Sequence, residues 1–94
     1  MSAPREPRLL PWSGPEGKPC YLITDDAGGP VSRLADTTEA TQLTMGAELL
    51  AHARGLLPGA PQGELRYLAE CLADALADAL RVAESRGRRL HRLN

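Results

Sequence analysis

Phenylalanine is absent from this chain, and residues that favour β-strands are scarce throughout it. Isoleucine and valine occur only as Ile23, Val31 and Val82, and the aromatic residues are Trp12, Tyr21 and Tyr67. Because strands favour β-branched and aromatic side chains, this scarcity excludes an all-β fold. Leucine, with 16 residues, and alanine, with 14, are the most frequent residue types. Both favour helices, so the composition predicts a mainly α protein.

Cysteine and long apolar runs are also scarce. Cys20 and Cys71 are too few for a disulfide framework, and no pair of Cys or His residues has the spacing of a zinc site. No segment approaches the ~20 apolar residues that span a bilayer, and the proline-rich start of the chain has no signal-peptide core. We therefore expect a cytoplasmic protein with reduced thiols, no metal, no cofactor and no membrane contact.

The length of 94 residues predicts one small domain. A chain of this size buries only about 60–65% of its unfolded surface, which leaves no room for a deep, enclosed active site. The sequence also lacks a phosphate-binding loop and any marked nucleophile with a neighbouring base. We therefore expect that the protein is not an enzyme.

Residues 1–19 are expected to form an irregular arm, because they contain five prolines. Trp12 is the one large aromatic residue in this arm. It either covers the edge of the core or contacts a protein partner, since tryptophan is enriched at binding hot spots.

Residues 20–34 carry the strand signal. Cys20–Thr24 is short and apolar, the Asp-Asp-Ala-Gly-Gly segment that follows is typical of a turn, and Pro30–Leu34 is the predicted return strand. A two-stranded hairpin is marginally stable alone, so it should lie on the helices. Tyr21, on this hairpin, is a second candidate for contact with a partner.

Two helices are predicted after the hairpin. Asp36 is the expected N-cap of a helix over residues 37–55, with Glu39 completing a capping-box pattern. A longer helix is expected over residues 62–86. The short linker Pro58–Pro61 predicts that the helices are antiparallel. Residues 20–86 would then form a single ββαα domain, of mainly α (α+β) class.

A leucine ridge on the second helix predicts self-association. The ridge drifts around the helix and is flanked by alanines, so it is wider than the stripe of about 100° that one neighbouring helix covers. A second copy would close it into a four-helix bundle. The expected interface residues are Leu65, Leu68, Leu72, Leu76, Ala79 and Leu80.

Residues 87–94 are expected to form a basic C-terminal tail. Residues 37–85 carry a net charge of −4, whereas residues 86–94 carry +4. The basic residues are Arg86, Arg88, Arg89 and Arg92. They either complement the helix dipole as solvated cations, or contact nucleic-acid phosphates or an acidic protein surface.

Three stretches of the chain resemble a group of short actinobacterial proteins without an assigned function. They are Gly14–Leu22, Val31–Asp36 and Leu80–Gly87, and the resemblance covers roughly residues 9–90. It brings no catalytic motif, and it implies a cytoplasmic accessory or regulatory protein of such bacteria.

The resulting hypothesis is a self-associating, non-enzymatic module that binds a protein partner. Two alternatives remain open at this point. One is a small nucleic-acid-associated regulator that uses the arginine-rich end of the chain. The other is a binder of a small ligand, with its pocket at the helix or dimer interface.

Overall fold

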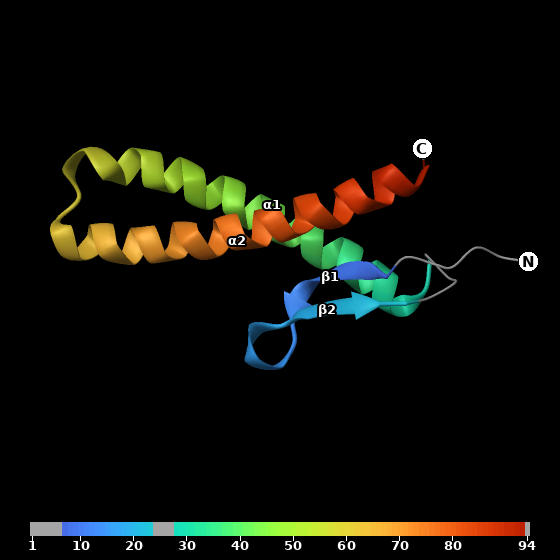
Figure 1. Ribbon diagram of the computed structural model, residues 1–94. Helices are drawn as coiled ribbons and strands as arrows, with labels where there is room; N and C mark the ends of the chain where they lie inside the picture. Colours follow the sequence, from blue (N-terminus) through green and yellow to red (C-terminus); the bar gives the residue numbers. More distant parts are fainter. Residues whose placement is uncertain (1–6, 24–27, 94) are drawn as a thin grey trace, which may run out of the picture.

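The chain folds as a β-hairpin followed by two long antiparallel helices (Figure 1). This computed structural model describes residues 7–23 and 28–93, with side chains up to residue 90. The elements are β1 (Arg8–Ser13), the helical turn η1 (Pro15–Gly17), β2 (Pro19–Leu22), α1 (Pro30–Leu56), the turn η2 (Leu57–Gly59) and α2 (Gln62–Leu93). The expected mainly α fold, with a hairpin and a helical pair, is confirmed. Over the residues described, none of the helices is long and apolar enough to cross a membrane.

The hairpin begins earlier in the chain than predicted. Its strands are Arg8–Ser13 and Pro19–Leu22, so the predicted first strand is in fact the second one. The turn-rich segment between them closes the hairpin, where the Gly14 amide donates to the Lys18 carbonyl at 2.7 Å. Gly17 has a φ of 74° there, a conformation that glycine adopts without steric cost. The expectation of an irregular arm over residues 1–19 was therefore wrong for β1.

Pro11 lies inside β1, although proline disfavours a regular strand. The strands pair at Arg8 with Leu22, Leu9 with Tyr21 and Ser13 with Pro19, and the register is irregular between Leu9 and Ser13. Proline is tolerated there because edge strands and bulges do not require its missing amide. The Pro11 carbonyl instead accepts hydrogen bonds from Gln42 Nε2 at 2.8 Å and Arg81 Nη1 at 3.2 Å. Side chains of both helices thus replace the partners that a regular strand would offer.

Helix α1 starts seven residues before its predicted start at 37. Gly29 is its N-cap, and Pro30 occupies the first turn, where the fixed φ of proline suits a helix. Ser32, Ala35 and Glu39 are all buried, at the spacing of one helical face. The predicted return strand Pro30–Leu34 was therefore wrong, and so was the assignment of Asp36 as the N-cap.

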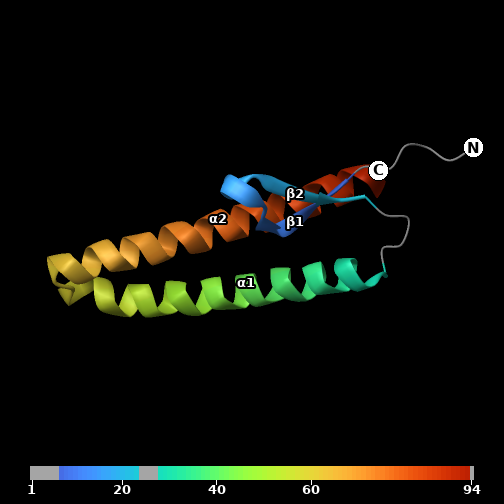
Figure 2. The ribbon, with the colours of Figure 1, turned by 90° about the horizontal axis from the view of Figure 1, so that it is seen from below.

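Helix α2 continues to Leu93 instead of ending near residue 86. Residues 87–93 are consequently helical, rather than an irregular tail. Gly87 lies within this helix, although a glycine in a helix interior costs about 1 kcal/mol relative to alanine. The two helices run antiparallel from the turn that joins them and cross near the middle of the molecule in Figure 1, and the hairpin lies against the C-terminal half of α2 (Figure 2).

The core of the chain is small and partly polar. Its buried apolar residues are Leu9, Leu10, Ala35, Ala53, Leu68 and Val82, and buried beside them are Ser32, Glu39 and Ser85. β1 supplies three consecutive buried residues, Leu9–Pro11, which places the core around this strand. Among the residues described, fourteen large apolar side chains are exposed, more than the six apolar residues that form the core.

Candidate interaction surface

An open apolar groove of about 280 Å³ runs between α1 and α2. It is lined by Gln42, Leu43, Gly46, Ala47 and Leu50 from α1, and by Leu72, Ala75, Leu76 and Ala79 from α2. None of these residues is charged, and none comes from the hairpin. We call this feature the apolar groove. Its glycine and alanines leave space between the leucines. In helix packing, such spaces accept the side chains of a neighbouring helix.

The leucines of the apolar groove are partly exposed in the single chain. Leu76 is 60% exposed, Leu50 45% and Leu43 36%.

The interface residues expected from the sequence fall into three groups. Leu72, Leu76 and Ala79 line the apolar groove. Leu65 and Leu80 are exposed, at 38% and 61%, outside that lining. Leu68 is 7% exposed and belongs to the core of the single chain, so it is not free to contact a second copy.

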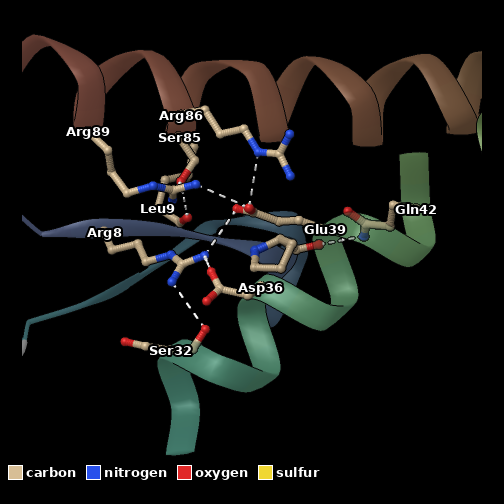
Figure 3. Close-up of polar contacts among 10 residues, drawn as sticks. Arg8, Leu9, Ser32, Asp36, Glu39, Gln42, Ser85, Arg86 and Arg89 are labelled. Carbon is tan, nitrogen blue, oxygen red and sulfur yellow. Dashed lines mark hydrogen bonds and ion pairs between the residues drawn. The ribbon is translucent and has the colours of Figure 1, made fainter. Parts of the chain in front are cut away.

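A buried glutamate joins β1, α1 and α2 near the other end of the molecule (Figure 3). Glu39 is 1% exposed, and three guanidinium groups surround its carboxylate. Arg8 Nη2 of β1 lies 3.5 Å from Oε2. Arg86 Nε and Arg89 Nη2 of α2 lie 3.5 Å and 3.2 Å from Oε1. We call these four residues the Glu39 cluster.

The Glu39 cluster has further polar partners at its edge. Arg8 also contacts Asp36 Oδ1 at 2.6 Å and donates to the Ser32 carbonyl at 3.1 Å. Removing a carboxylate from water costs several kcal/mol, and only close charges and hydrogen bonds offset that cost. Three guanidiniums around one carboxylate supply the opposite charge, although Arg8 Nε and Glu39 Oε2 are buried without a hydrogen-bond partner among the residues described. The cluster joins β1 to both helices.

Ser85 ties β1 to α2 beside this cluster. Its Oγ donates to the Leu9 carbonyl at 2.8 Å and accepts from Arg89 Nη1 at 2.6 Å. Ser85→Ala should lower the free energy of unfolding by about 1–3 kcal/mol, because a buried carbonyl is left without its donor. Urea unfolding at fixed protein concentration measures this change.

Ser13→Ala is the matched control for that substitution. Ser13 is the exposed last residue of β1, and exposed positions of this kind change stability by no more than about 0.5 kcal/mol. Equal effects of the two substitutions would show that the Ser85 hydrogen bond does not hold β1 on α2.

Three of the four arginines at the C-terminal end already contact side chains of this chain. Arg86 and Arg89 contact Glu39, and Arg88 Nη2 donates to Glu84 Oε1 at 2.9 Å. Arg92 belongs to the last turn of α2, where the side chains lie outside the described part of the structure. These arginines therefore extend along a helix, and two of them turn inward toward α1.

The two aromatic candidates for partner contact both lie on the hairpin. Trp12 is half-buried on β1. Tyr21 on β2 is 45% exposed, and the guanidinium of Arg88 lies over its ring at 5.7 Å from the centroid. This cation–π contact connects β2 to α2 and leaves part of the Tyr21 ring at the surface.

Both cysteines are free, half-buried thiols. The proximity of the Cys71 side chain raises the pKa of Tyr67 above its usual value of 10.0. Among the residues described, no three His, Cys, Asp or Glu side chains are grouped to hold a metal ion.

Sequence reasoning missed both the Glu39 cluster and the α1 wall of the apolar groove. The cluster joins residues 50 positions apart on α1 and α2, and no local pattern reports such a contact. The α1 wall did leave a signal, because Leu43, Ala47 and Leu50 recur at helical spacing.

Comparison with protein-family models, curated proteins and solved structures gives no match for this chain.

Proposed function

We propose that this protein is a non-enzymatic, self-associating module. In this proposal the apolar groove seats the same face of a second copy, and the two helical pairs form a four-helix bundle. The single observation that carries the proposal is the exposure of leucines such as Leu76 along an uncharged groove. Exposed apolar patches rimmed by polar residues often mark protein–protein interaction sites.

The small number of buried apolar side chains relative to exposed ones supports a second copy of the chain as the occupant of the apolar groove. Few large apolar side chains are buried, whereas fourteen are exposed. A small domain with so little core is marginally stable alone, and association adds the missing burial. In a two-fold dimer each protomer covers the apolar groove of the other, so one symmetric interface covers both grooves.

The hairpin would remain outside such a bundle, because it contributes no residue to the groove lining. Trp12 and the exposed part of Tyr21 would then be available to a different protein. This is the surface that we propose for a regulatory or accessory role in a cytoplasmic, bacterial setting.

The nucleic-acid alternative has less support from the side-chain contacts. Phosphate binding requires arginines that are free to replace counterions. Arg89 contacts the buried Glu39 and Arg88 contacts Glu84, so of the three C-terminal arginines with described side chains only Arg86 has both Nη atoms without a partner among the residues described.

Sedimentation equilibrium at micromolar concentration tests the proposal. We expect a folded species with twice the 10.1 kDa mass of the chain, and a midpoint of thermal unfolding that rises with protein concentration. A stable, well-folded species of 10.1 kDa at the same concentrations would overturn the proposal.

A further inference from the structure

We infer that the two copies dock antiparallel, so that the hairpin end of one lies over the interhelical turn of the other. This inference rests on the proposed self-association and adds the orientation of the second copy. Two layers of two helices that meet face to face have two closed two-fold arrangements. The axis runs either along the helices, which gives a parallel pair, or across them, which gives an antiparallel pair.

The two ends of the protein carry opposite charge. The part of the molecule from residue 43 through the interhelical turn to residue 79 has five acidic and two basic residues, a net charge of −3. The acidic residues are Glu48, Glu64, Glu70, Asp74 and Asp78, and the basic ones are Arg54 and Arg66.

The remaining residues with described side chains form the hairpin end of the molecule. They include seven basic and four acidic residues, a net charge of +3, and the full sequence outside residues 43–79 has nine basic and seven acidic residues, a net charge of +2. The basic residues are Arg8, Lys18, Arg33, Arg81, Arg86, Arg88 and Arg89, and the acidic ones are Glu16, Asp36, Glu39 and Glu84. Figure 1 shows these two ends at opposite extremes of the helical pair.

This distribution distinguishes the two arrangements. A parallel pair would place acidic end on acidic end and basic end on basic end, and like charges oppose association. An antiparallel pair places each acidic end on a basic one. Such complementarity fixes orientation and register across an interface even where it adds little affinity.

Arg86 provides a group suited to the partner's acidic end. It contacts Glu39 through Nε, and its side chain is 48% exposed. In Figure 3 its two Nη atoms point away from Glu39, and no partner for them is found among the residues described. Arg86 lies on α2 two turns beyond Ala79, the last groove residue of that helix. In an antiparallel pair this position faces the turn end of the second copy.

Distances between spin labels test the orientation. In a Cys20→Ser/Cys71→Ser background, a label is attached to Gly63→Cys, near the turn, or to Gly87→Cys, near the other end. A side chain at either glycine meets nothing within 4 Å. From the helical rise of 1.5 Å per residue and a pair centred on the groove residues of α2, two Gly63→Cys labels should be about 40 Å apart in an antiparallel dimer. In a mixture, Gly63→Cys to Gly87→Cys should be much shorter, at about 10–15 Å, because the two positions lie at nearly the same height and are separated only by the width of the bundle.

The reverse order of distances in a species of dimer mass would overturn the antiparallel arrangement while leaving self-association in place. Monomer mass and no label–label distance within a pair would instead overturn the proposed function itself, so the two failures are distinguishable.

Salt provides a second measurement on the unlabelled protein. Attraction between exposed charges is screened within about 10 Å at 0.1 M salt and 3 Å at 1 M. The dissociation constant of an antiparallel dimer should therefore rise several-fold between these salt concentrations. A dissociation constant that falls with added salt would indicate that like ends meet, and would overturn the inference.

Discussion

Leu76→Glu should convert the dimer into a monomer and raise the dissociation constant at least 100-fold. Leu76 is 60% exposed in the single chain, so glutamate at this position disturbs few contacts within a monomer. At the centre of a closed bundle, the same carboxylate would be buried without a partner, at a cost of several kcal/mol. Sedimentation equilibrium of the variant should give the mass of one chain.

Leu34→Glu is the matched control for Leu76→Glu. Leu34 is 56% exposed on α1, the substitution is the same, and Leu34 is not among the groove residues. We expect this variant to remain a dimer. If the two variants dissociate equally, the groove is not the interface. If Leu76→Glu stays dimeric, a different surface joins the copies.

Glu39→Gln should lower the free energy of unfolding by about 3–5 kcal/mol, the usual cost of removing one partner from a buried ion pair. Arg8 would lose a carboxylate while its own side chain is 13% exposed, and glutamine carries no charge to compensate three guanidiniums. For a domain of this size the change corresponds to more than about 10 °C in Tm. Thermal and urea unfolding at one protein concentration measure the loss.

Asp36→Asn provides the contrast to Glu39→Gln. Asp36 contacts the same arginine but is 62% exposed, and exposed ion pairs contribute no more than about 1 kcal/mol. If both variants lose the same stability, burial of the Glu39 carboxylate is not what makes the cluster important.

The helical part of the fold was predictable because its signals are local. The Leu and Ala periodicity, the prolines at 58 and 61, and the short linker between the helices all lie within single elements. The groove residues on α2 were predictable for the same reason, because their pattern lies within one helix. Leu72, Leu76 and Ala79 recur at helical spacing, and two neighbouring elements are too few to cover such a ridge.

The hairpin and the helix ends were not predictable in the same way, because distant partners decide them. β1 contains Pro11, whose carbonyl is satisfied by Gln42 and Arg81 rather than by a strand. Asp36 and Glu39 have the spacing of a capping box, but both side chains contact Arg8 instead. The structural roles of these residues depend on contacts with chain segments about 30 to 70 positions away, which no local pattern contains.

The hydrogen bond from Ser85 to Leu9 has a consequence for synthesis of the chain. Its two residues are 76 positions apart, and at ~5–20 residues per second the ribosome needs about 4 to 15 seconds to make the intervening segment. During that interval the segment Leu9–Pro11, which is buried in the folded chain, has no α2 to cover it. The nascent chain therefore presents an apolar strand for several seconds, a window in which a chaperone or a neighbouring nascent copy can bind it.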